Sequence, residues 1–142
     1  MPVLDEEASL RELHARLAAV LPRDAEIIFV DDGSADGTPA VLAELSRRDA
    51  RTRVVRFRRN FGKSMALLAG FRRARGEIVA TMDGDLQEDP EDILKLEGEL
   101  ARGFDLACGW RRDRRDPHRK VLGSRIFNWL VSAFGGKRFH DI

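Results

Sequence analysis

Apolar residues recur along the chain with two alternating spacings. In the first segment they stand three or four residues apart, at Leu10, Leu13, Leu17 and Val20. This spacing predicts an amphipathic helix over residues 6–20 that ends before Pro22. The next apolar run, residues 26–31, is short and contains β-branched residues, which predicts a buried strand.

The same alternation continues to the end of the chain. Further helices are expected over residues 38–48, 62–75, 90–102 and 120–134, and further strands over residues 53–57, 77–82 and 104–108. Thr38 stands at the N-cap of its helix, with Pro39 at the first helical position. Strands that alternate with helices over short loops predict an α/β fold, with a mostly parallel sheet covered by helices on both faces. In such sheets ligands bind at the carboxyl ends of the strands.

The strand at 26–30 runs into an acidic loop that contains glycines. Asp31 and Asp32 are adjacent at the end of this strand, and Gly33 follows them. Two carboxylates at this place suit hydrogen bonds to the edge of a nucleotide base or to ribose hydroxyls. The alternative is a polar turn that serves only to cap the following helix.

The strand at 78–82 ends in a second acidic segment. Asp83, Gly84 and Asp85 follow one another, and Gln87 comes two residues later. Alternate residues of an extended chain point the same way, so Asp83, Asp85 and Gln87 can present three oxygens in one direction. Mg²⁺ and Mn²⁺ take oxygen ligands and bridge to diphosphates, which predicts a metal site here. The alternative is an acidic turn without a metal.

A basic loop lies between the two acidic segments. Gly62, Lys63 and Ser64 invite comparison with a P-loop, but the first glycine of that motif would fall at residue 57, which is Phe57. A P-loop is therefore rejected. A basic loop that enters a helix N-terminus suits a neighbouring phosphate, and Lys63 is its candidate ligand. Ordinary solvent-facing basic side chains are the alternative.

Composition adds limits to this outline. The 142 residues include 43% hydrophobic side chains, enough for a core, and 25 basic against 24 acidic residues give a net charge of +1. The total charge therefore indicates no polyanionic partner, although residues 51–75 carry nine basic and no acidic side chains. The basic stretch at 111–120 has no recognisable nucleic-acid module. The single cysteine, Cys108, excludes an internal disulfide and agrees with a reducing compartment. No apolar run approaches the roughly 18 residues of a membrane span.

Four segments, taken in order, resemble one known family. They are Pro2–Glu7, Val30–Thr38, Arg59–Lys63 and Met82–Pro90. Together they resemble family 2 glycosyltransferases, most of all dolichyl-phosphate mannose synthases and bacterial polyprenyl-phosphate glycosyltransferases. The resemblance covers nearly the whole chain. It implies a GT-A fold, a nucleotide-diphospho-sugar donor, a Mg²⁺ or Mn²⁺ cofactor, and inversion at the anomeric carbon.

The resemblance also implies roles for individual residues. The residues implied on the nucleotide-sugar side are Pro2, Leu4, Glu6, Asp31, Asp32, Lys63, Asp83 and Gly84. Those implied at the metal are Asp83, Asp85 and Gln87. Asp85, Arg111 and Asp141 are the implied catalytic residues, with Arg111 near the phosphates and Asp141 near the acceptor.

These assignments predict transfer of a hexose from the donor to a polyprenyl phosphate. A lipid phosphate is already ionised at neutral pH, so it needs no strong general base, and histidines are scarce near the motifs. The amphipathic segment 120–134 and the basic residues before it can lie at the cytoplasmic face of a membrane, or the helix can simply face a core. Two other functions remain open. One is a non-catalytic nucleotide-binding fragment. The other is a haloacid-dehalogenase-type phosphohydrolase, which would need Thr or Val where Gln87 stands.

The chain departs from the family pattern in three places. Only Met1 precedes Pro2, where the family has a full apolar strand, and Asp5 replaces the usual asparagine. The family also continues well past Asp141. We therefore expect residues 1–142 to be a single catalytic domain without its first strand and its C-terminal remainder. Expressed alone, it is expected to aggregate, exchange strands or be partly molten, and to transfer no sugar.

Overall fold

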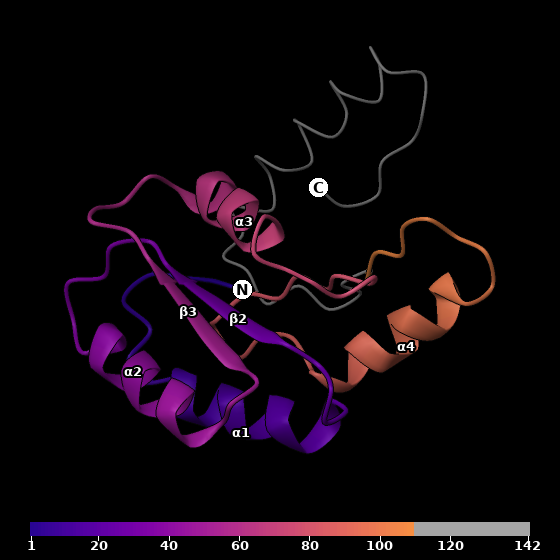
Figure 1. Ribbon diagram of the computed structural model, residues 1–142, viewed down its shortest axis with the longest axis horizontal. Helices are drawn as coiled ribbons and strands as arrows, with labels where there is room; N and C mark the ends of the chain where they lie inside the picture. The colour runs from indigo at the N-terminus through magenta and orange to yellow at the C-terminus, as the bar shows by residue number, and fades with distance from the viewer. Residues whose placement is uncertain (110–142) are drawn as a thin grey trace, which may run out of the picture. The chain divides into compact units, whose positions relative to one another are not determined.

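Three parallel strands form a sheet in the part of the chain that the structure describes (Figure 1). The computed structural model describes residues 1–109. The strands are β1 (Pro2–Val3), β2 (Ile27–Asp31) and β3 (Thr52–Arg56), and they pair in the order β1-β2-β3. Four helices accompany them in this part of the chain: α1 (Leu10–Val20), α2 (Thr38–Arg48), α3 (Lys63–Phe71) and α4 (Glu91–Leu100). The predicted α/β architecture with a parallel sheet is confirmed.

Helices lie on both faces of the sheet. Figure 1 shows α1 and α2 on one side and α3 on the other. Phe29 of β2 is fully buried in the core formed with α1 and α2, and its neighbour Val30 is 1% exposed. A β-carbon on Gly70 of α3 would lie 3.5 Å from Cγ2 of Val30, so α3 packs closely on the second face. Burial on both faces explains why β2 reads as a continuous apolar run.

The start of α1 differs from its prediction. The helix begins at Leu10, because Glu6 and the residues after it are held by the loop before α2. The backbone N–H of Glu6 donates to Oγ1 of Thr38 at 2.8 Å. Thr38 therefore does not cap α2; its own backbone N–H donates instead to Oδ1 of Asp36 at 2.9 Å. The sequence pattern could not reveal a cap that is used by a distant segment.

Residues 77–82 do not form the predicted strand. Met82 packs in the core beside Val3, but Ile78 and Val79 are 49% and 47% exposed. Among the described residues no backbone hydrogen bond joins this segment to the sheet. A strand needs a neighbour for its backbone groups. The neighbour here is β1, which offers two residues paired with Val30 and Asp31 of β2.

The strand predicted over residues 104–108 is not formed either. Phe104 is 57% exposed and Leu106 is 77% exposed, so neither apolar side chain enters a core. β1 consists of only two residues, Pro2 and Val3. The predicted helix 120–134 lies outside the described residues.

His14 is buried between α1 and the start of β3. Its Nε2 lies 2.8 Å from Oγ1 of Thr52 and 3.5 Å from Oδ2 of Asp49. Burial lowers the pKa of His14 from its ordinary 6.5; the Asp49 carboxylate opposes this shift, and Arg51 adds to it. The folded protein therefore holds His14 neutral at a pH where the unfolded chain already takes up a proton.

We predict that the free energy of unfolding falls as the pH drops below about 6.5, the ordinary histidine pKa. Urea unfolding at a series of pH values measures this loss. His14→Gln, which keeps a polar group beside Thr52, should flatten the curve in that range. The Met1 amine also has a pKa lowered by burial, from 8.0 to about 6. Its effect is present in both proteins and cancels in the comparison. An unchanged curve in the variant would assign the pH dependence to other groups.

Candidate functional site

Several of the predicted site residues that the structure describes lie where β1 and β2 end. Three segments meet there: the loop after β1, the loop after β2 and the acidic segment that begins at Asp83. The N-terminus of α3 adds Lys63 to the same region. This is the carboxyl edge of the sheet, where ligands bind in open parallel sheets.

The first two loops are joined by their backbone amides. Oδ1 of Asp5 accepts the backbone N–H of Ala35 at 2.8 Å, and the backbone N–H of Asp5 donates to Oγ of Ser34 at 3.0 Å. A second link runs from the backbone N–H of Gly37 to Oε2 of Glu7 at 3.0 Å. Asp5 has a φ of 54°, a left-handed conformation that aspartate adopts more readily than most residues. The carboxylate that replaces the usual asparagine therefore serves as a clamp between the loops.

Three candidate nucleotide contacts come from this N-terminal segment. Pro2 lies in β1, and Leu4 follows it with 41% of its surface exposed. The carboxylate of Glu6 accepts the hydroxyl of Ser9 at 2.9 Å, within the same turn. Leu4 is therefore the member of this group that offers an open apolar surface.

Asp31 is fully buried at the last position of β2. Its Oδ1 accepts the backbone N–H of Ser34 at 2.8 Å, which closes the turn after the strand. Its Oδ2 is buried, makes no hydrogen bond within the described residues, and lies 3.3 Å from Nε of Arg56. The positive charge that offsets the buried Asp31 carboxylate is therefore the Arg56 guanidinium, whose side chain is 61% exposed.

Asp32 connects β2 to the N-terminus of α3. It is 4% exposed, and its two oxygens accept the backbone N–H groups of Phe61 at 2.7 Å and Gly62 at 2.9 Å. Gly62 is the N-cap residue of α3, so the carboxylate lies at the positive end of this helix. Asp32 thereby positions the basic loop that carries Lys63.

Gly33 allows the loop after β2 to approach the basic loop before α3. Its φ is +82°, and a β-carbon there would lie 2.4 Å from the backbone carbonyl carbon of Arg59. We predict that Gly33→Ala lowers the free energy of unfolding by about 2 kcal/mol or more, from left-handed strain plus the clash with backbone. Urea unfolding measures the loss.

Gly98 provides the matched control for this change. It lies in α4, and a β-carbon there would have no neighbour within 4 Å. Gly98→Ala should therefore stabilise the protein, by up to about 1 kcal/mol. Equal effects of the two substitutions would show that the contact between Gly33 and Arg59 is not tight in solution.

The acidic segment approaches both β1 and α3. Nζ of Lys63 lies 2.7 Å from Oδ1 and 2.8 Å from Oδ2 of Asp83, which comes twenty residues later in the chain. A β-carbon on Gly84 would lie 3.0 Å from Cγ1 of Val3, so the absent side chain permits this close packing. The structure thus brings together three predicted donor-side residues: Lys63, Asp83 and Gly84.

Asp85 and Gln87 lie on an exposed turn and not on an extended chain. The backbone N–H of Gln87 donates to Oδ1 of Asp85 at 3.1 Å, and Leu86 between them has a φ of 60°. The alternation that predicts three oxygens on one side therefore does not apply to this segment. Within the described part of the chain, no group of three or more His, Cys, Asp or Glu residues is placed to hold a metal.

Two carboxylates nevertheless suit a magnesium or manganese ion. Mg²⁺ is usually held by one or two carboxylates together with substrate phosphates and water. Asp83 and Asp85 are two such ligands, both accessible to solvent. The chemistry of the donor set therefore fits a cation that arrives with a diphosphate. Arg111 and Asp141, the other predicted catalytic residues, lie outside the described residues.

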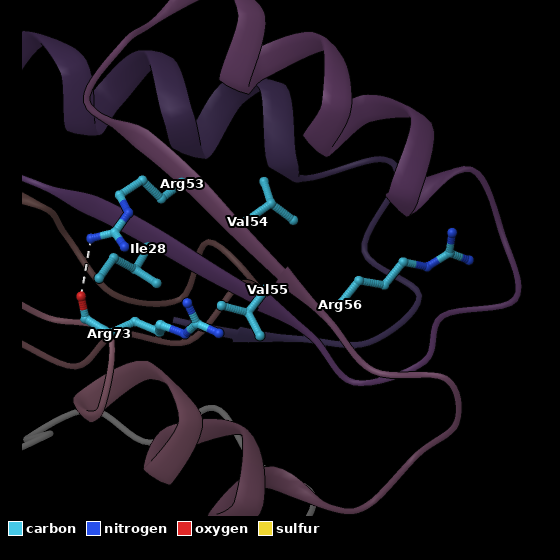
Figure 2. A pocket seen from close by; sticks show the side chains of 6 residues that line it. All are labelled: Ile28, Arg53, Val54, Val55, Arg56 and Arg73. Carbon is cyan, nitrogen blue, oxygen red and sulfur yellow. Dashed lines mark hydrogen bonds between the residues drawn. The ribbon is translucent and has the colours of Figure 1, made fainter.

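A hollow that the sequence did not indicate lies along β3 (Figure 2). Its volume is about 300 Å³, and its lining residues are Ile28, Arg53, Val54, Val55, Arg56 and Arg73. Arg53 donates to Oε2 of Glu26 at 2.7 Å and to the backbone oxygen of Arg73 at 3.0 Å. The guanidinium of Arg73 has no hydrogen-bond or ion-pair partner among the described residues. The hollow is basic, and it is not the site of the carboxylates.

Comparisons with known proteins bear on the family of the chain. The family model described as Glycosyl transferase family 2 matches residues 1–139. The chain is 40% identical to a dodecaprenyl-phosphate galacturonate synthase of Rhizobium johnstonii, over 99% of the chain and 44% of that protein. It is 41% identical to an undecaprenyl-phosphate 4-deoxy-4-formamido-L-arabinose transferase of Pseudomonas aeruginosa, over 99% of the chain and 43% of that protein. The chain thus spans less than half the length of these relatives.

Proposed function

We propose that this chain, which belongs to glycosyl transferase family 2, forms the donor-binding part of a polyprenyl-phosphate glycosyltransferase. This part binds a nucleotide-diphospho-sugar at the carboxyl edge of its sheet, and the whole enzyme transfers the sugar to a polyprenyl phosphate with inversion. The names of the relatives support this acceptor, since they specify dodecaprenyl phosphate and undecaprenyl phosphate.

The transferred sugar is proposed to be a hexose. One relative is named for galacturonate, which is derived from a hexose, and the other for a modified arabinose, which is a pentose. The first name supports a hexose-type sugar, and the second does not. The reaction is proposed to take place at the cytoplasmic face of the membrane that holds the lipid acceptor.

The observation that carries the proposal is the contact between Lys63 and Asp83. An ammonium and a carboxylate from distant segments meet at 2.7 Å beside the N-terminus of α3. A diphosphate that enters this place finds a cation, a helix N-terminus and two acids able to hold a divalent metal. Both side chains are partly exposed, so the ion pair itself contributes little to stability and its loss on ligand binding would cost little.

The chemistry follows from the groups at this edge. Asp83 and Asp85 would hold Mg²⁺ or Mn²⁺, which supplies Lewis-acid neutralisation of the departing diphosphate. Lys63 would move from Asp83 to a phosphate oxygen and add a charge-assisted hydrogen bond. An ionised oxygen of the acceptor phosphate attacks the anomeric carbon from the opposite face, and the bond from that carbon to the diphosphate breaks. The acceptor arrives without a proton to remove, so no general base is required of the chain.

Product analysis tests this proposal. A version of the protein extended to the length of its relatives is incubated with nucleotide-sugars, undecaprenyl phosphate and Mn²⁺. The expected products are a polyprenyl-phospho-sugar of inverted configuration and a nucleoside diphosphate. Release of free sugar, or of inorganic phosphate from a phosphate ester, would replace the proposal with a hydrolase.

A further inference from the structure

Helix α3 is apolar on nearly all sides. Of its nine residues only Lys63 and Ser64, in the first turn, are polar. A helix that is apolar all round is usually buried on every side, in a protein core or in a membrane. We therefore expect α3 to be covered on its outer face as well as on the face toward the sheet.

The sheet covers the inner face of α3. Ala66 is fully buried, and Gly70, one turn later, lies against Val30 of β2. Small residues four positions apart let the helix backbone approach the strands closely. Three large side chains of α3 are left exposed on the outer face.

The outer face is open. Met65, Leu68 and Phe71 are 49%, 40% and 50% exposed and recur at intervals of three residues. Phe61, which precedes the helix by two residues, is also 50% exposed. We call these four side chains, Phe61, Met65, Leu68 and Phe71, the α3 apolar face. Several large exposed apolar side chains on one helix and on the loop before it indicate an interaction surface.

Basic side chains border this face at both ends. Arg58 and Arg59 precede it, and Arg59 lies over the ring of Phe61 at 5.0 Å from the ring centroid. Exposed arginines 72, 73 and 75 follow it, and Arg73 reaches along the basic hollow on β3 (Figure 2). No acidic residue occurs anywhere between Ala50 and Gly76. The surface is therefore apolar in the middle and positive at its borders.

We propose that the α3 apolar face and its arginines dock on a membrane surface that contains anionic phospholipids. The apolar side chains enter the boundary between headgroups and acyl chains, and the arginines bind lipid phosphates. This inference rests on the proposed function only for the presence of a lipid acceptor at the same membrane. A second copy of the chain is the less suitable occupant, because pairing two such faces would bring together two sets of arginines with no acids between them.

Binding to vesicles tests the inference. The full chain is sedimented with vesicles of phosphatidylcholine alone and of phosphatidylcholine mixed with phosphatidylglycerol, and binding is expected only to the mixture. Leu68→Asp should lower the partition coefficient at least about tenfold. The variant loses a leucine that would be buried in the membrane, and it gains a negative charge that the anionic lipids repel. Leu94→Asp is the matched control, because Leu94 is 43% exposed on α4 and should leave binding unchanged.

The charged border is tested in the same assay. Arg72→Gln should weaken binding to the mixed vesicles about fivefold, while Arg102→Gln, at an exposed position after α4, should not. A fluorophore on Met65→Cys, in a Cys108→Ser background, should shift to the blue with mixed vesicles, and one on Leu94→Cys should not. The labelled pair keeps the test valid if Leu68→Asp fails to fold.

Three results would overturn the inference. They are absence of vesicle binding by the parent chain, equal loss in the Leu68 and Leu94 variants, and self-association that depends on Leu68 without lipid. Donor binding is measured on the same proteins by calorimetry. If the chain binds donor but not vesicles, the docking proposal fails and the proposed function stands. If the chain binds vesicles but not donor, the proposed function fails and the docking proposal stands.

Discussion

Asp85→Ala is expected to lower the rate of sugar transfer by about 10² to 10⁴, in a version of the protein extended to the length of its relatives. The reason is that the substitution removes a carboxylate ligand and leaves the charge of the departing diphosphate uncompensated. Folding should be unaffected, because Asp85 is exposed and its hydrogen bond is local, to the backbone N–H of Gln87. Initial rates at saturating donor, together with the thermal unfolding midpoint, separate the two effects.

Asp89→Ala is the matched control for this prediction. Asp89 is also exposed and also accepts a backbone N–H two residues later, from Glu91 at 3.0 Å. It should lose its local hydrogen bond and keep its transfer rate. The metal assignment would fail if Asp85→Ala and its parent turned over equally, or if a chelator left the parent's rate unchanged.

Asp32→Ala is expected to lower the free energy of unfolding by about 3–5 kcal/mol, which is the second large effect. Hydrogen bonds to a charged group contribute about 1.5–3 kcal/mol each, and the buried carboxylate of Asp32 accepts two from Phe61 and Gly62. The same substitution should weaken donor binding by about 1–3 kcal/mol, because it releases the loop that positions Lys63. Urea unfolding measures the first loss and calorimetry the second.

Asp36→Ala supplies the comparison. Asp36 is exposed, and its carboxylate also accepts two backbone N–H groups, from Glu7 and Thr38. Solvent can replace these bonds, so the loss of stability should be clearly smaller than for Asp32. Equal losses would show that burial of Asp32 is not what makes its two bonds strong.

The elements that are best predicted from sequence are those whose signals are local. The predicted bounds of α2 agree with the structure, because Pro39 and the apolar spacing act within the helix itself. β2 is predicted to within one residue at its start, since a run buried on both faces reads as apolar without reference to its neighbours.

The errors lie where structure depends on distant partners. The strand expected over 77–82 has suitable residues, yet β1 offers it too short a neighbour. The expected alignment of Asp83, Asp85 and Gln87 fails for the same reason, because without the strand the segment turns at Leu86. Strand propensity describes how well residues fit into an existing sheet. It does not provide the neighbouring strand that their backbone groups need.

The candidate site shows the same division. Its predicted location at the carboxyl edge rests on the alternation of elements, and in the structure Lys63 lies against Asp83 of the acidic segment. The clamp by Asp5 and the hold of Asp32 on α3 could not be found, since both need the folded loops to be adjacent. The outer face of α3 did leave a signal in the sequence, a helix with apolar residues on every side, and that signal could have been followed.

Calorimetric titration with nucleotide-diphospho-sugars, on a version of the protein extended to the length of its relatives, is the measurement that tests the central claim most directly. The claim is that the carboxyl edge of the sheet, with Lys63, Asp83 and Asp85, is a metal-dependent donor site. We predict binding in the presence of Mn²⁺ that falls at least about tenfold when the metal is chelated or when Asp83 is replaced by asparagine, and that persists in Asp89→Ala. Binding that ignores both the metal and Asp83, or no binding by a chain with a cooperative unfolding transition, would contradict the account.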